Sequence, residues 1–500
     1  MSAELVPVGQ LSQAGSAREG DDRQRAGWLF VVLWAVNIGM AAAILFLGLP
    51  KLTVGTVTMF LLLGLILVGV PVGYSMLIAS IVCLTALGGL QLASASLTGI
   101  IFESVANWQY SVIPMFVMMG VALWTSGLSG RTYGAARQWL SWLPGGLGVA
   151  TNFAGAGLAA ASGSTMGIVM TLGKVALPEM MKRRYSPALA TGSVAMAGTL
   201  GQVIPPSILL VVYAGVAETP VGPQLLAGLI PGLILALGFA TVIVCWALIV
   251  PSAAPRLLDR SITWRSRLTS LIPVIPVLLV VFLVIGGMFT GIFTATEAAA
   301  VGAVAALLVG VFCRGKGTRS LPKIGRYIWN TAQEAVRSIA GLFLVLLGAV
   351  LLTSAIARSG IAQSLSTWLV SLEPDRVTLM FGLILFYLVL GMFLESLPMI
   401  LLTVPILIAP LEAVGVDMIW FGVFVIIMCE IGMVFPPIGI VTFIVHRLAQ
   451  DPRTNSGVPV SLVAVFKGVL PFVALATAAL IVFVYFPEIV LWLPNSSASE

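Results

Sequence analysis

Long apolar stretches alternate with short polar connections along the chain, from Trp28 to Trp492. Each stretch contains about 18 or more mostly apolar residues, which is enough to cross roughly 30 Å of hydrocarbon as a helix. The stretches lack the period-two alternation of a membrane β-barrel, so the pattern predicts an all-α polytopic membrane protein. We expect full crossings at residues 28–48, 53–71, 74–93, 110–127, 187–218, 223–250, 270–290, 292–313, 338–357, 417–447 and 463–487.

Two further apolar stretches, residues 145–181 and 377–411, are interrupted near the middle. The first break is Ser162-Gly163-Ser164 and the second is Glu395-Ser396. Half-length segments on either side of a polar break are typical of a re-entrant helical hairpin. The irregular tip of such a hairpin must lie within protein or line a watery cavity, because lipid cannot satisfy bare backbone.

Composition and charge support a membrane location. Hydrophobic residues make up 59% of the 500 positions, charged residues 9%, and mean hydropathy is +1.09. The net charge of +6 comes from Lys and Arg in connecting loops, and it does not indicate nucleic-acid binding. With both hairpins and a cytoplasmic N-terminus, only Lys51, Arg358 and Arg376 fall outside the cytoplasm. We therefore expect a bacterial inner-membrane protein whose residues 1–27 form a cytoplasmic tail and not a cleaved signal peptide.

One segment of the sequence occurs twice. Residues Leu200-Gly201-Gln202-Val203-Ile204-Pro205-Pro206 align with Ile431-Gly432-Met433-Val434-Phe435-Pro436-Pro437 at a shift of 231 positions. The order of helix, hairpin, broken helix and helix therefore repeats, over residues 110–250 and again over residues 338–487. An odd number of crossings separates the two starts, which predicts inverted repeats of the kind found in secondary transporters.

Each Pro-Pro pair removes two backbone donors and disfavours helix at the residue before each proline. Carbonyls near the bilayer centre then lose their helical partners. Together with hydroxyls at the hairpin tips, from Ser162, Ser164 and Thr165 or from Ser396, they offer hard oxygen ligands suited to Na⁺. A Pro-Pro pair can also merely kink a helix, but two pairs in register, each beside a broken hairpin, favour a site.

Three acidic residues lie in apolar segments, where charge is costly and often functional. Glu297, which follows Thr296 near the start of a helix, favours a structural role such as capping over ion coupling. For Glu395 and Glu430 both roles stay open. The chain shows neither a P-loop nor a readable catalytic triad, so we expect a protein that is not an enzyme and needs no cofactor. Its energy would come from an ion gradient or from another chain.

These residues resemble the large membrane subunit of tripartite ATP-independent periplasmic (TRAP) transporters, the DctM-like group. The likeness covers about residues 52–495. It is carried by five segments in family order: Gly69-Val70-Pro71-Val72-Gly73, Ala161-Ser162-Gly163-Ser164, Gly201-Gln202-Val203-Ile204-Pro205-Pro206-Ser207, Gly291-Ile292-Phe293-Thr294-Ala295-Thr296-Glu297-Ala298-Ala299 and Gly432-Met433-Val434-Phe435-Pro436-Pro437-Ile438-Gly439.

The resemblance implies an elevator-type carrier that couples uptake to Na⁺. It also implies a small four-helix membrane subunit, and a periplasmic binding protein that delivers an organic acid such as a dicarboxylate, keto acid or sugar acid. By the same resemblance, one sodium site comprises Ser162, Gly163, Ser164, Thr165, Gly201, Val203, Pro205, Pro206 and Ser207. The other comprises Glu395, Ser396, Leu397, Gly432, Val434, Pro436, Pro437 and Gly439.

The chain departs from the family pattern in two ways. It has an additional N-terminal helix over residues 28–51, which is too little to be a fused small subunit, and Glu395 stands at its second hairpin tip. An acid there could bind a cation or disfavour an anionic substrate. Two alternatives to a binding-protein-dependent carrier stay open. One is a self-sufficient Na⁺/anion symporter of similar fold, and the other is a membrane scaffold or enzyme.

Overall fold

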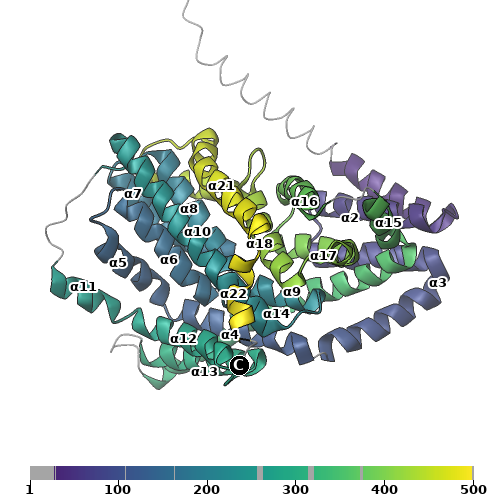
Figure 1. The fold of residues 1–500 in the computed structure, drawn as a ribbon, viewed down its shortest axis with the longest axis horizontal. Coiled ribbons are helices and arrows are strands. Elements are labelled where there is room, and N and C mark those ends of the chain that lie inside the picture. The colour runs from purple at the N-terminus through teal and green to yellow at the C-terminus, as the bar shows by residue number, and fades with distance from the viewer. Residues whose placement is uncertain are drawn as a thin grey trace, which may run out of the picture. The chain divides into compact units, whose positions relative to one another are not determined.

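The computed structural model describes residues 28, 30–106, 108–162, 164–255, 263–313, 320–371 and 375–497. The regular elements within these ranges are helices, and Figure 1 shows their order along the chain. Six of them are long and apolar enough to cross a membrane, or up to nine when each of three bent pairs is taken as one span. The prediction of an all-α polytopic fold is therefore confirmed.

The chain divides into two compact units, made of residues 1–105 with 343–365 and of residues 106–342 with 366–500. The first unit contains the helix Phe30–Phe46, α2 (Lys51–Leu67), most of α3 (Val72–Ala106) and the second half of α14 (Leu321–Ser359). α14 packs closely on α3 in this unit. A Cβ on Gly348 of α14 would lie only 2.8 Å from the carbonyl oxygen of Gly73 on α3.

The second unit contains the elements that form the hairpins and broken helices. In chain order they are η1 (Trp108–Ser111), α4 (Val112–Thr125), α5 (Leu128–Leu140), α6 (Gly146–Ser162), α7 (Thr165–Lys182), α8 (Pro187–Val203), α9 (Ile208–Val216), α10 (Val221–Ile249), η2 (Pro251–Ala253), α11 (Trp264–Leu271), α12 (Ile275–Phe289), α13 (Ala295–Phe312), the first half of α14, most of α15 (Ile361–Ser371), α16 (Arg376–Gly391), α17 (Ser396–Ala413), α18 (Met418–Val434), α19 (Ile440–Ala449), α20 (Pro452–Asn455), α21 (Leu462–Tyr485) and α22 (Glu488–Ser497).

The internal repeat is present in the helix boundaries themselves. α7 and α17 each have 18 residues, α8 and α18 each have 17, and every boundary of these pairs is displaced by the 231 positions read from the sequence. The two cis peptide bonds, Pro205-Pro206 and Pro436-Pro437, obey the same displacement. Both predicted hairpins and both broken helices are thus confirmed, as α6/α7 with α8/α9 and as α16/α17 with α18/α19.

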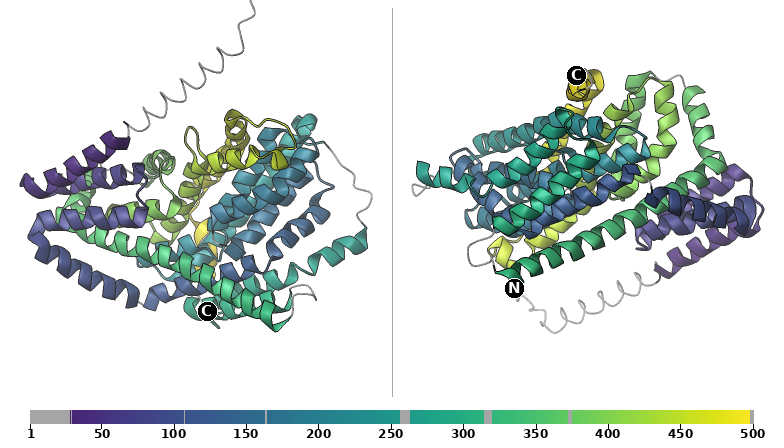
Figure 2. Two further views of the ribbon diagram at one scale, coloured as in Figure 1. Left: turned by 180° about the vertical axis from the view of Figure 1, so that it is seen from behind. Right: turned by 90° about the horizontal axis from the view of Figure 1, so that it is seen from below.

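Contacts between the repeats are reciprocal: where a helix of the first copy packs on a helix of the second, their equivalents also pack on each other. α7 packs on α19 while α17 packs on α9, and α8 packs on α21 while α18 packs on α10. α8 and α18 also pack on each other. When element A of one copy touches element B of the other and the converse also holds, an approximate twofold axis relates the copies. Figures 1 and 2 show α6, α7, α8 and α10 lying side by side in the first copy.

The core of this unit surrounds α8 and α18. Every residue of α18 from Trp420 to Val434 is buried, as are 14 of the 17 residues of α8. A helix that is apolar all round belongs inside a bundle. Trp420 stacks on Phe424 with ring centroids 5.4 Å apart, and its indole nitrogen donates to the carbonyl oxygen of Phe483. The outer surface instead exposes large apolar side chains, such as Phe282 at 75% and Leu385 at 66%.

Several crossings differ from the sequence-based expectation. The span expected at 338–357 is the end of one 39-residue helix, α14, whose polar first half lies outside every expected span. The span expected at 74–93 extends to Ala106 and kinks at Gly88 and Gly89, where Gly89 has a φ of +75°. The span at 270–290 is the bent pair α11 and α12, which meet at 47°. The tail at 1–27 lies outside the described residues.

Candidate functional site

The tip of the first hairpin is built by a helix start. Ser164 is the N-cap of α7, and its hydroxyl accepts the backbone N–H of Gly167 at 3.3 Å. Serine is a favoured N-cap because its oxygen satisfies a free backbone donor of the first turn. Gly163 lies outside the described residues, as does the side chain of Ser162, which ends α6. The next residue, Thr165, is buried and turns inward.

The two hairpin tips meet at one carboxyl group. Thr165 donates its hydroxyl to Oε2 of Glu430 at 2.7 Å, and Ser396 donates to Oε1 of the same residue at 2.9 Å. All three side chains are at most 4% exposed. Thr165 is the first residue of α7 and Ser396 is the first residue of α17, so the two hydroxyls occupy equivalent positions in the two repeats.

The helix breaks supply backbone oxygens. In an α-helix the N–H of residue i bonds the carbonyl of residue i−4, so Pro205 and Pro206 leave the carbonyls of Gly201 and Gln202 without helical partners. The Ser207 hydroxyl donates a hydrogen bond to the Gln202 carbonyl. Within the described part of the chain, no group donates a hydrogen bond to the Gly201 carbonyl. The first break is buried from Val203 to Ser207.

The second break behaves similarly. Pro436 and Pro437 leave the carbonyls of Gly432 and Met433 without helical partners. The backbone N–H of Phe435 donates a hydrogen bond to the Gly432 carbonyl at 3.1 Å. The Met433 carbonyl has no hydrogen-bond partner among the described residues. Val434 and Gly439 are buried, whereas Leu397 and Pro436 are half-buried and Pro437 is exposed. Each break therefore leaves one backbone carbonyl without a partner among the described residues, and such oxygens suit a hard monovalent cation.

Gln202 was not singled out from the sequence. Its side-chain oxygen is buried and has no hydrogen-bond partner in the described structure. Its counterpart in the second repeat, 231 positions later, is Met433, whose sulfur lies 3.6 Å from the Ser396 hydroxyl. A buried amide oxygen without a partner is costly and needs an explanation. The available signal was a lone polar residue inside an apolar Gly-x-x-x-Pro-Pro segment.

A cavity of about 210 Å³ opens beside the first hairpin. The polar side chains lining it are Ser164 and Thr171 of α7 and Glu334 and Ser338 of α14. The other lining residues are Gly120, Val121, Trp124, Leu158, Gly167 and Ile168. The cavity thus connects the N-cap of α7 with an acidic side chain on a separate helix.

Two of the three acidic candidates lie away from the buried oxygens. Glu395 is the N-cap position of α17, but its side chain makes no cap hydrogen bond and is exposed. Glu297 closes a capping box with Thr294: its backbone N–H donates to the Thr294 hydroxyl at 3.3 Å and its carboxylate accepts the Thr294 backbone N–H at 2.9 Å. This geometry is that of an N-terminal helix cap, and Thr296 lies within the same first turn.

The comparisons with known proteins agree with this architecture. The family described as "Tripartite ATP-independent periplasmic transporter, DctM component" matches residues 59–489. The chain belongs to this DctM family. It is 30% identical over 450 residues to the C4-dicarboxylate TRAP transporter large permease protein DctM of Vibrio cholerae, covering 87% of this chain and 96% of the relative. It is also 30% identical over 440 residues to the sialic acid TRAP transporter large permease protein SiaM of the same organism, with the same coverage.

A solved structure shares the fold at greater distance. The crystal structure of the YdaH transporter of Alcanivorax borkumensis superposes with a TM-score of 0.58 and 14% identity, covering 80% of this chain and 90% of that one. The family resemblance drawn from the sequence is confirmed by the DctM family match over residues 59–489. The DctM-family chain is a multi-pass membrane transporter component, with inverted repeats that each contain a re-entrant hairpin and a broken helix.

Proposed function

We propose that this DctM-family chain forms the transport pathway of a Na⁺-coupled carrier for a small organic acid. The observation that carries the proposal is the meeting of both hairpin tips at Glu430, between two proline-split helices. α8 and α18 end there with free carbonyls, which favour a cation. α7 and α17 begin there, and helix N-termini favour an anionic group. One buried region thus offers complementary ends for Na⁺ and for a carboxylate.

The substrate class rests on the relatives. The two Vibrio cholerae relatives are named for C4-dicarboxylate and for sialic acid, which are both carboxylic acids. We propose a substrate of this kind, taken up with the help of a periplasmic binding protein and a small four-helix membrane subunit. Na⁺ would move as the coupling ion, held at one site by Thr165 and the Gly201 carbonyl and at the other by Ser396 and the Met433 carbonyl. A moving domain made of the two hairpins and the two broken helices would slide against a scaffold as an elevator.

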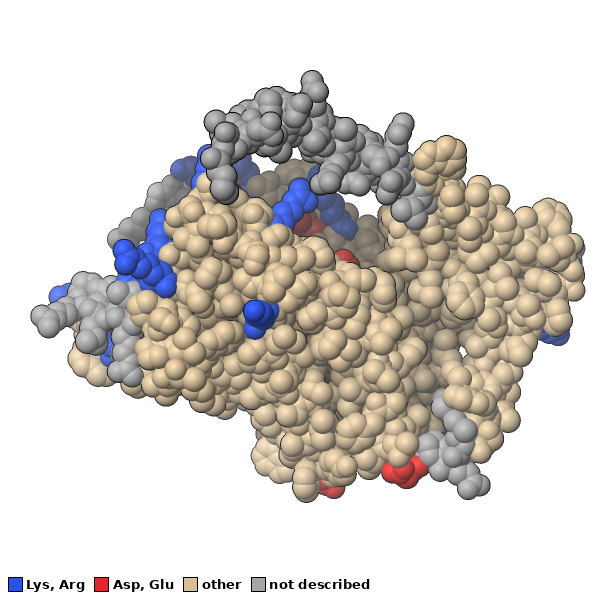
Figure 3. Space-filling view, turned by 90° about the horizontal axis from the view of Figure 1, so that it is seen from above, with Lys and Arg blue, Asp and Glu red and all other residues tan. Residues whose placement is uncertain are grey.

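Location and orientation follow the charge pattern. The surface is mostly uncharged on the face in Figure 3, as expected of a chain surrounded by lipid. We propose that the protein lies in the bacterial inner membrane with a cytoplasmic N-terminus, because this orientation places most Lys and Arg on the inside.

Reconstitution into proteoliposomes tests the proposal. The expected result is uptake of a carboxylic acid that requires an inward Na⁺ gradient, is abolished when choline replaces Na⁺, and requires both added partners. Uptake by this chain alone would instead establish a self-sufficient symporter. Uptake that is equal in Na⁺ and in choline would overturn Na⁺ coupling.

A matched pair of variants ties the outcome to the site. Ser396→Ala removes a buried hydroxyl at the second tip, whereas Ser371→Ala removes an exposed one at the end of α15. We expect the first to raise the Na⁺ concentration for half-maximal uptake by about 10-fold or more. We expect the second to leave it unchanged.

A further inference from the structure

Glu430 occupies a position at which the two repeats carry different residues. Its counterpart 231 positions earlier is Thr199, whose hydroxyl donates to the Met196 carbonyl of its own helix at 2.8 Å. The carboxyl of Glu430 instead reaches the first residue of each hairpin's second helix. A group from one repeat therefore binds equivalent hydroxyls of both repeats, near the approximate twofold axis.

The direction of these hydrogen bonds matters for cation binding. A hydroxyl has one hydrogen and two lone pairs. Because Thr165 and Ser396 each give their hydrogen to Glu430, their lone pairs are left for another partner. Within the described part of the chain neither hydroxyl accepts a hydrogen bond. Donation also increases the negative charge on a hydroxyl oxygen, as partners of metal ligands commonly do.

We propose that Glu430 is a positioning residue that orients the hydroxyls of both hairpin tips as cation ligands and so couples the two sodium sites to each other. The inference rests on the proposed function. Glu430 does not itself need to touch the ion. It keeps each hydroxyl hydrogen turned away from the incoming cation, and one carboxyl does this for both sites. A change at one tip is therefore transmitted to the other through a single side chain.

The test is an equilibrium Na⁺-binding titration of the full chain in lipid nanodiscs, followed by intrinsic tryptophan fluorescence, with choline replacing Na⁺ at constant ionic strength. The wild-type protein should bind Na⁺ saturably with a Hill coefficient above 1. If wild type shows no response to Na⁺, the proposed function fails, and the role of Glu430 falls with it. If wild type responds, the variants decide the inference separately.

Glu430→Gln is the informative substitution, because an amide keeps the size but can accept with only one of its two terminal atoms. One hydroxyl must then turn its hydrogen toward its site. We expect the half-maximal Na⁺ concentration to rise about 10-fold to 100-fold and the Hill coefficient to fall toward 1. Glu412→Gln, an exposed acid on α17, is the control and should titrate as wild type. A Glu430→Gln protein with the wild-type midpoint and Hill coefficient would overturn the proposal.

A second measurement covers the case in which Glu430→Gln does not fold. Thr165→Val and Ser396→Ala each remove one hydroxyl and leave the carboxyl in place. Because both hydroxyls share one carboxyl, their effects on the Na⁺ midpoint should not multiply, and the double variant should depart from the product by about 3-fold or more. Effects that multiply within error would show two independent sites and sink the inference.

Discussion

Gly391 of α16 and Gly432 of α18 face each other so closely that a Cβ on either would lie 2.7 Å from the Cα of the other. The contact joins the second hairpin to the broken helix behind it, directly before the tip. Both neighbours are backbone, so neither can move aside cheaply.

We therefore expect Gly432→Ala to lower stability by about 1–3 kcal/mol through overpacking. Thermal unfolding in detergent measures the effect. Gly382→Ala on α16 is the matched control, because no atom lies within 4 Å of the added methyl group, and alanine there should be neutral or stabilising. Equal stability of the two variants would contradict the close packing.

Gln202→Met should separate stability from binding. Methionine stands at the equivalent position of the second repeat, and it removes the buried oxygen that has no partner in the described structure. We expect the ion-free protein to melt at the same or a higher temperature, since an unpaired buried acceptor costs about 1–3 kcal/mol. The half-maximal Na⁺ or substrate concentration should rise.

The control for Gln202 is Gln333→Met, an exposed position on α14. A Gln202→Met protein that is destabilised and binds normally would show that the amide is structural.

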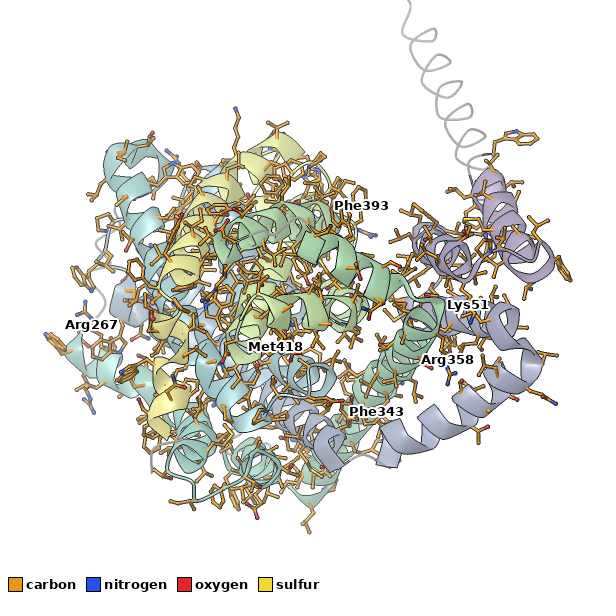
Figure 4. The ribbon with its side chains drawn as sticks, turned by 45° about the vertical axis from the view of Figure 1, so that its right-hand side comes forward. Lys51, Arg267, Phe343, Arg358, Phe393 and Met418 are labelled. Carbon is orange, nitrogen blue, oxygen red and sulfur yellow. The ribbon has the colours of Figure 1, made fainter. Side chains whose placement is uncertain are left out.

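Tyr213→Phe tests the joint between the repeats. The Tyr213 hydroxyl of α9 donates to the carbonyl of Met418 at 2.6 Å, and Met418 begins α18 (Figure 4). Loss of one buried hydrogen bond should cost about 1 kcal/mol. Tyr485→Phe changes a 55% exposed side chain and should cost nothing measurable by thermal unfolding. Equal melting temperatures for the two variants would argue against this contact.

Asp375 predicts a pH dependence at the start of the second hairpin. The Thr378 hydroxyl and the backbone N–H groups of Thr378 and Val377 donate to its carboxylate and hold the pKa of Asp375 below its usual value. A lowered pKa stabilises the folded protein above the unfolded-state pKa of about 4, and this contribution is lost as pH falls through the folded-state pKa.

Asp375→Ala should therefore fray the first turn of α16 at neutral pH and matter less below about pH 4. Hydrogen exchange at the Val377 and Thr378 amides measures this change. Asp375→Ser keeps a cap without a titrating charge, so its exchange should follow pH only through the chemical rate. A difference between Asp375→Ala and wild type that persists unchanged at pH 3 would refute the assignment.

The repeat could be predicted because it depends on local chemistry. A Pro-Pro pair breaks a helix wherever it stands, and a polar tripeptide in an apolar stretch ends one, so α7 and α17 begin at the expected tips. The first half of α14 could not be predicted from hydropathy, because it is amphipathic and is held by packing on α4. There the Tyr327 hydroxyl donates to the Ala122 carbonyl. The partners of Glu430 lie 265 and 34 positions away, and nothing local in the sequence indicates either distance.

The exchanged packing of the two halves has a consequence for the resting state. If each half can adopt the other's conformation, the forms open to either side of the membrane would have equal energy in a perfectly duplicated chain. Only positions where the copies differ can make these two energies unequal. Near the hairpin tips such positions include Ser164, equivalent to Glu395, and Thr199, equivalent to Glu430. A few unmatched side chains would then decide which way the empty carrier faces.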